Sequence, residues 1–188
     1  MITREQALAL IEEHVANKNI IKHMVALEAV MGALADKLSA DNKTEWQMAG
    51  LLHDGDYCEG VPAEKQGIQV VIWAKEKGFE VSENVAHAMA AHNWENTKVE
   101  PQNAMDWSIF CADSLTGLIV ACALVLPSRK LADVTVEMVL KKFGQKSFAG
   151  GTRRDDIKKC EEKLSIPLEE FIKISLSAMQ AISTDLGL

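Results

Sequence analysis

The chain has 188 residues, of which 48% are apolar, and a formal net charge of -7. This length and apolar content predict one domain over residues 1–188, with a sizeable core. Because binding to phosphate backbones needs a basic face, the acidic balance leads us to expect no nucleic acid polymer as a partner.

The chain shows no targeting signal of a familiar kind. Glu12 and Glu13 stand where a secretory signal peptide needs apolar residues. The apolar stretch 108–127 contains Asp113, and a carboxylate inside a membrane is costly, so we interpret this stretch as a buried core helix. The four cysteines show no CxxC spacing and are expected to be free thiols. We therefore expect a cytoplasmic protein with no membrane partner.

Helical periodicity dominates the first half of the chain, and alternating strand patterns are weak. Thr3 followed by Gln6 is typical of a capping box and predicts a first helix that runs to Val15. The apolar spacing and the breakers then predict helices over residues 20–38, 43–53, 62–77 and 82–91.

The second half continues the helical pattern. Asn103 is expected to start a long core helix that Pro127 ends. Shorter helices are expected over residues 133–143 and 152–164, and Pro167 is expected in the first turn of a last helix. The sequence therefore predicts an all-α fold with about eight or nine helices.

Several polar residues lie on apolar helix faces. His23 shares a face with Leu27, Val30 and Leu34, at steps of four, three and four residues, so we expect it to point inward. Asp113 lies in the same way in the middle of the long core helix. A buried carboxylate costs several kcal/mol, roughly, unless it is paired or bound to a metal.

The pair His53-Asp54 follows the apolar end of a short helix and is also expected to face the interior. Three helices would then direct His23, His53, Asp54 and Asp113 toward one region. Two imidazoles and two carboxylates suit Mn, Fe, Zn, Ni, Co or Mg better than a soft metal. We therefore expect one divalent ion, with a second ion left open because Asp54 can bridge.

Two more histidines follow in the segment VAHAMAAHNWE. His87 and His92 lie five residues apart, about 140° around a regular helix, so both reach one site only if the helix ends near Ala91. His92 is the better candidate for a second metal or for substrate phosphate, and His87 for a surface or supporting role.

The order His23, His53-Asp54, Asp113 resembles the HD-domain superfamily of metal-dependent phosphohydrolases, which carries an H…HD…D pattern on a helical bundle. The resemblance covers roughly residues 20–125, and the helices of residues 128–188 would pack on that core. It implies that these four residues are metal ligands. The chain differs from many members in lacking a lysine shortly after the pair, where it reads Gly55-Asp56-Tyr57.

The resemblance implies hydrolysis of a nucleotide or another small phosphoester by metal-activated water. Asp54, His92 and Asp56 are the candidate catalytic residues, although Asp56 is also a common turn residue. The candidates for binding phosphate are Lys22, His87, Arg129, Arg153 and Arg154.

Two alternatives remain open at this level. One is a module that binds metal or nucleotide without catalysis, and the other is oxygenation at a di-iron centre on the same fold. A homodimer is a further expectation that the sequence does not decide.

Overall fold

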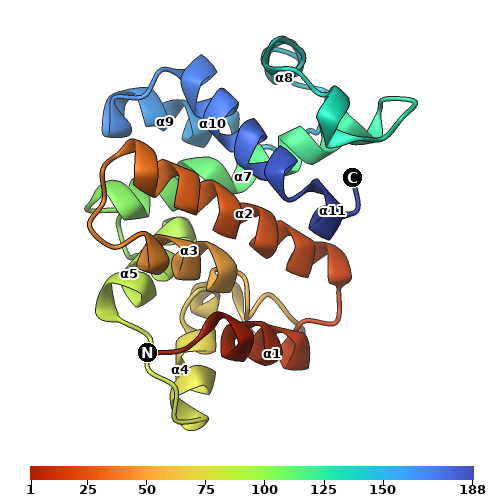
Figure 1. Cartoon of the computed structure of the whole chain (residues 1–188). Helices are drawn as coiled ribbons and strands as arrows, with labels where there is room; N and C mark the ends of the chain where they lie inside the picture. The colour runs from red at the N-terminus through yellow and green to blue at the C-terminus, as the bar shows by residue number, and fades with distance from the viewer.

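The computed structural model describes residues 1–188 and is entirely helical, which confirms the predicted all-α class (Figure 1). Two of its eleven α-helices, α6 and α11, have four residues each, so nine helices have eight residues or more. The α-helices are α1 (Arg4–His14), α2 (Lys18–Lys37), α3 (Lys43–Leu52), α4 (Gln69–Glu76), α5 (Glu83–His92), α6 (Trp94–Thr97), α7 (Ala104–Leu124), α8 (Val136–Phe143), α9 (Arg154–Leu164), α10 (Leu168–Ala181) and α11 (Ser183–Leu186), with 3-10 helices η1 (Ala63–Lys65) and η2 (Leu131–Asp133).

Side-chain caps start several helices where the sequence predicts them. The Thr3 hydroxyl accepts from the Gln6 amide while the Gln6 side chain accepts from the Thr3 amide, which completes the capping box. Ser82 caps α5 and Asn103 caps α7, each through a side-chain oxygen that accepts a main-chain N–H group.

Two predicted helix boundaries are wrong. The single helix expected over 62–77 is divided into η1 and α4, because the chain turns at Gly67, whose φ is +86°. Asp133 ends η2 rather than starting a helix, and Thr135 caps α8 instead.

The core is built around α2 and α7. Figure 1 shows α2 running across the molecule, with α3 against it on one side and α7, α10 and α11 on the other. Helix α5 packs on α3 and α7, and α9 packs along α7. The helices after residue 128 therefore pack on the elements that carry the H…HD…D residues.

Helices α2 and α3 approach closely at Gly50. A Cβ atom at this position would lie 2.7 Å from the carbonyl oxygen of Leu27, which real side chains do not tolerate. Glycine therefore allows the main chains of the two helices to meet. This close approach brings the end of α3, with His53, next to His23 on α2.

Helix α7 is the one helix that is long and apolar enough to cross a membrane by length and composition. In the structure 61% of its most apolar 18-residue window is buried inside the protein, and the core helix of a globular protein passes the same test. Its packing against α2, α5, α9 and α10 matches the interpretation of this stretch as a core helix.

Candidate metal centre

Four helices bring three imidazoles and two carboxylates together. His23 lies in α2, His53 and Asp54 directly follow α3, His92 is the last residue of α5, and Asp113 lies in the middle of α7. His53 is fully buried, and the side chains of Asp54 and Asp113 are 21% and 17% exposed. The sequence-predicted set His23, His53, Asp54 and Asp113 therefore converges in space, with His92 beside it.

The ligand atoms are close enough to share one cation. Nε2 of His23 lies 3.1 Å from Nε2 of His53 and 3.1 Å from Oδ1 of Asp113. Oδ2 of Asp54 lies 3.4 Å from Nε2 of His53. Since Zn–N bonds measure about 2.1 Å, two nitrogens on one ion stand roughly 3 Å apart. The observed spacing matches that value.

Each histidine of the cluster is oriented by a contact between its Nδ1 atom and an oxygen atom. His53 Nδ1 lies 2.9 Å from the carbonyl oxygen of Gly50, and His92 Nδ1 faces the carbonyl oxygen of Met89. A carbonyl only accepts, so we assign the proton of both rings to Nδ1. Both Nε2 atoms then carry lone pairs that point toward the carboxylates.

His23 reaches the same state through Thr116. The Thr116 hydroxyl donates to the Asp113 carbonyl oxygen at 2.8 Å, which uses its only proton. It therefore accepts from Nδ1 of His23, 3.0 Å away, and leaves Nε2 of His23 as a lone pair. Two imidazole lone pairs 3.1 Å apart repel each other unless a cation or a proton lies between them, so the donor set fits a metal.

The carboxylates remain ionised in this setting. Burial raises the pKa of Asp54, but the charges and hydrogen bonds of His53 and His92 outweigh it and hold that pKa well below its usual range. Burial likewise raises the pKa of Asp113, and the hydrogen bond and charge of His23 lower it to about 2. The centre therefore presents negative charge to any cation that enters it.

The same negative charge acts on the imidazoles. Burial lowers the pKa of His23 and of His92, but Asp113 raises the first and Asp54 the second, and the net shift is upward in both. A field that favours a proton on a ring nitrogen also favours a metal ion at the same lone pair.

The residues form two overlapping ligand sets, His23 with His53 and Asp113, and His53 with Asp54 and His92. Both sets use Nε2 of His53, and one lone pair binds one ion. The two sets therefore cannot be filled together. The imidazole and carboxylate donors could bind a divalent metal, and their types do not identify it.

Arg153, one of the predicted phosphate-binding residues, reaches the centre. Its Nη2 atom lies 2.9 Å from Oδ2 of Asp113, and its Nε atom lies 3.2 Å from Oδ2 of Asp156. The guanidinium also lies over the ring of Phe110. It is the one predicted arginine that contacts a candidate ligand.

Asp56 has a different place from the catalytic one predicted. Its side chain is fully buried, and its two oxygens accept the main-chain N–H groups of Gly67, at 2.8 and 3.0 Å, and of Val70, at 3.0 Å. Burial raises the pKa of Asp56, although these hydrogen bonds lower it. The carboxylate holds residues 67–70 in place and does not face the cluster.

Gly67, which Asp56 holds, packs against the carbonyl group that His92 contacts. A Cβ atom at Gly67 would lie 2.4 Å from the carbonyl oxygen of Met89, the oxygen that His92 Nδ1 contacts. Asp56 thus fixes the main chain that packs behind His92, which is why the turn-residue alternative describes it better than a catalytic role.

His87 is not part of the centre. Helix α5 ends at His92, and His87 points instead to Asp106, with Nδ1 2.9 Å from Oδ2. Asp106 is fully buried in the first turn of α7. This contact joins α5 to α7, and it corrects the expectation that His87 binds phosphate beside the metal.

Two predicted phosphate-binding arginines also lie elsewhere. Arg129 is exposed in the turn after α7, with φ of +52°. Arg154 donates to main-chain carbonyls of the segment 142–152, among them Phe143 at 2.8 Å and Gln145 at 3.1 Å. Its guanidinium therefore fixes that segment and is not available for substrate.

Lys22 is exposed and lines a cavity that His23 and Thr116 also line. Thr116 itself was not among the predicted residues. Its position one turn after Asp113, on the same face of one helix, is the signal that could have identified it.

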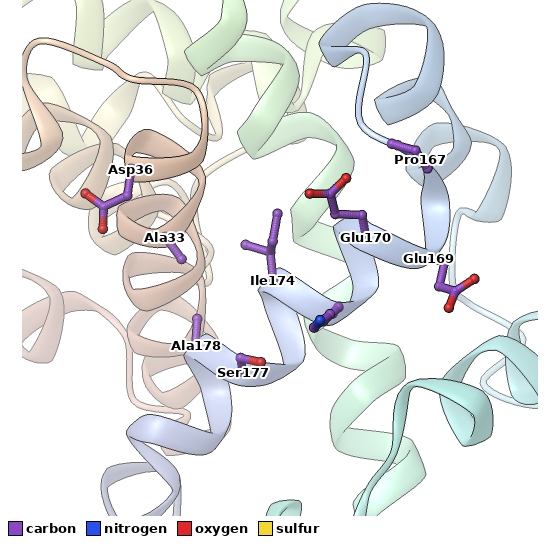
Figure 2. Close-up of a pocket in the computed structure, with 9 residues that line it drawn as sticks. Ala33, Asp36, Pro167, Glu169, Glu170, Ile174, Ser177 and Ala178 are labelled. Atoms are coloured by element: carbon purple, nitrogen blue, oxygen red, sulfur yellow. The ribbon is translucent and has the colours of Figure 1, made fainter.

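A cavity larger than the one lined by Lys22 and His23 lies apart from this cluster. It has a volume of about 790 Å³ and runs between α2 and α10, with Ala33 and Asp36 on α2 and Glu170, Ile174, Ser177 and Ala178 on α10 (Figure 2). It contains no histidine, so it offers no counterpart to the convergent ligand set.

Known proteins resemble part of this chain. It is 32% identical over 101 residues to Ribonuclease Y of Lawsonia intracellularis and 33% identical over 101 residues to Ribonuclease Y of Thermoanaerobacter pseudethanolicus. Ribonuclease Y of Nitratidesulfovibrio vulgaris is 30% identical over 102 residues. These alignments cover 53–54% of the chain but only 18–19% of the relatives, so the chain spans less than a fifth of their length. No family model and no solved structure matches the chain.

This similarity supports a hydrolase, at low identity and over part of the chain. It also corrects the expectation that a nucleic acid polymer is excluded, because the relatives are named for action on RNA. Whole-chain charge is a poor guide, because it does not show where the basic side chains lie. Lys146, Arg153 and Arg154 line one polar cleft, together with Glu95, Asp155 and Asp156, which balance their charge.

Proposed function

We propose that this chain is a metal-dependent phosphodiester hydrolase of the HD type. The observation that carries the proposal is the convergence of three Nδ1-anchored histidines and two ionised carboxylates on one point. The similarity to proteins named Ribonuclease Y supports the hydrolytic class and a diester substrate. A cytoplasmic location remains part of the same proposal.

The ligands are His23, His53, Asp54 and Asp113, and the ion is Mn, Fe, Zn, Ni, Co or Mg. When bound, such an ion polarises a phosphoryl oxygen and makes a coordinated water acidic enough to act near neutral pH. The Nδ1 acceptors hold the three rings in a fixed tautomer and orientation, so the site is organised before substrate arrives.

His92 and Arg153 have separate roles beside the ligands. Nε2 of His92 lies 3.4 Å from Oδ1 of Asp54, in a ring 6% exposed, so it can accept a proton from a group that approaches Asp54. The Arg153 guanidinium uses one nitrogen on Asp113 and one on Asp156. Its remaining N–H groups can donate to a non-bridging phosphate oxygen and neutralise developing charge.

The test starts with metal content. Protein purified without chelator is analysed by plasma mass spectrometry, stripped, and reloaded with each of the six metals. Hydrolysis is followed with bis-p-nitrophenyl phosphate as diester, p-nitrophenyl phosphate as monoester and an end-labelled RNA oligonucleotide. We expect one equivalent of metal and faster release of nitrophenol from the diester.

A matched pair of variants separates the site from the acidic surface. His92→Ala is expected to keep the metal and lower diester turnover about 100-fold, in the range of general acid–base catalysis. Asp133→Asn, an exposed carboxylate in η2, is the control. Metal binding with no turnover of any of the three substrates would instead favour the non-catalytic module, and oxygen uptake by iron-loaded protein would favour oxygenation.

A further inference from the structure

A cavity of about 460 Å³ adjoins the proposed metal centre on the side of His23. Its wall includes His23, the one candidate ligand that lines it, and Thr116, whose hydroxyl is hydrogen-bonded to His23 Nδ1. Lys22 and Asn19, both exposed, lie at its mouth, while Ala26, Val120, Leu124, Leu186 and Leu188 line it with apolar surface. Its size is that of a small-molecule site.

Gly117 lies at the wall of this cavity, in the middle of the 21-residue helix α7. It is exposed, while its chain neighbours Thr116 and Leu118 are buried. A Cβ atom there would meet no heavy atom within 4 Å, and φ is not positive, so neither packing nor backbone conformation requires glycine. Glycine inside a helix nevertheless costs about 1 kcal/mol relative to alanine.

We propose that Gly117 is a specificity-determining residue, because the missing side chain keeps this cavity open for the organic group of the substrate. The proposal rests on the function proposed above and adds a substrate class. The phosphate would lie at the metal centre, and an uncharged, partly apolar group of nucleoside size would lie in the cavity. Lys22 forms no ion pair with the protein and remains free to donate at the mouth.

The residues that line the cavity favour an uncharged, partly apolar group over a second phosphate. Five apolar side chains line the cavity, and Lys22 is the one cationic side chain among its lining residues. By contrast, the cleft beside Arg153 has no hydrophobic lining residue, and six of its eight lining residues are charged, three of them basic and three acidic. A nucleoside offers an apolar ring face to the walls and polar edges to Asn19 and Lys22.

The test uses a Gly117→Leu variant with thymidine 5′-monophosphate as the probe. Calorimetry on the protein as purified is expected to show at least a tenfold loss of affinity, because the leucine side chain fills the cavity. Gly144→Leu is the matched control, since Gly144 is exposed, ends a helix with φ of -68° and does not line the cavity that contains Gly117. Gly117→Ala should fold with slightly higher stability and intermediate affinity.

A kinetic measurement gives a second result. The ratio of kcat/KM for thymidine 5′-(p-nitrophenyl phosphate) to that for methyl p-nitrophenyl phosphate is expected to fall at least tenfold in Gly117→Leu. Thymidine 5′-monophosphate binding that stays within twofold of wild type in Gly117→Leu, or no binding to wild type at millimolar concentration, would overturn the inference. Absence of any diester turnover by metal-loaded wild type would instead overturn the proposed function, since the binding assay needs no turnover.

Discussion

Helix α2 contributes to two acidic regions that differ in every physical respect except charge. At the candidate metal centre, His23 lies beside two largely buried carboxylates, and each of the three imidazoles has an oxygen partner at Nδ1. Figure 2 shows Asp36 and Glu170 in the groove between α2 and α10. Asp36 pairs with Lys43 and Glu170 with Lys37, and all four side chains are at the surface. The groove is larger, but Asp36 and Glu170 are already paired with exposed lysines.

The difference teaches that convergence and burial, rather than cavity size or acidity, indicate a chemical site. Exposed carboxylates keep their hydration, so they gain little from a cation. Buried carboxylates next to fixed lone pairs have lost that hydration and gain from any ion that restores the charge balance. The four predictions below test this contrast.

The largest effect is expected from removing a ligand. Asp113→Ala should lose most of the bound metal and lower diester turnover at least 1000-fold, about 4 kcal/mol. Asp36→Ala in the groove is the matched control and should keep both. Plasma mass spectrometry and a nitrophenol assay measure the two quantities. An Asp113→Ala protein with full metal content and turnover would remove Asp113 from the ligand set.

The next effect concerns the support behind His92. Gly67→Ala places a Cβ atom 2.4 Å from the Met89 carbonyl oxygen and should lower the free energy of unfolding by roughly 2–4 kcal/mol. Gly60→Ala is the control. Gly60 has φ of +90°, but a Cβ atom there would meet no atom within 4 Å, so only the cost of a left-handed backbone, about 1–2 kcal/mol, remains. Urea unfolding compares them, and equal losses would show that the contact with Met89 is unimportant.

A smaller effect is expected at Thr116, which contacts a candidate ligand but is not one itself. Thr116→Val keeps the size of the side chain but removes the oxygen that accepts from His23 Nδ1. We expect metal affinity to fall 10- to 100-fold with little change in fold, as for other groups that orient a ligand. Competition with a metal-sensitive dye measures the affinity, and the exposed Thr44→Val is the control. Unchanged affinity would mean that Thr116 does not orient the ring.

The smallest effect is expected in the groove. Lys37 and Glu170 are both 42% exposed in their side chains, so Glu170→Gln should change the free energy of unfolding by less than about 1 kcal/mol. The change should shrink further in 1 M salt, where charges are screened over about 3 Å. Thermal unfolding at low and high salt measures it. A loss of several kcal/mol in the free energy of unfolding would show that the Lys37–Glu170 pair is more than a weak surface contact.

The sequence alone determined the helical class, the helix starts at Thr3, Ser82 and Asn103, and the inward faces of His23, His53 and Asp113. These are local properties, because helix periodicity decides which side chains share a face and a cap needs only residues three apart. The resemblance to the HD pattern added the order of the ligands. Neither source indicated Thr116, whose role depends on a hydrogen bond between α2 and α7.

Tertiary structure decided what neighbouring residues of the same type do. Arg153 reaches Asp113 while Arg154 fixes main-chain carbonyls. Asp54 lies among the candidate ligands while Asp56 holds Gly67 and Val70. One or two residues along a chain change the direction of a side chain completely, and only the packed partner shows which direction meets a ligand. The same reason separates His92 from His87, because the end of α5 turns one ring toward Asp54 and leaves the other on Asp106.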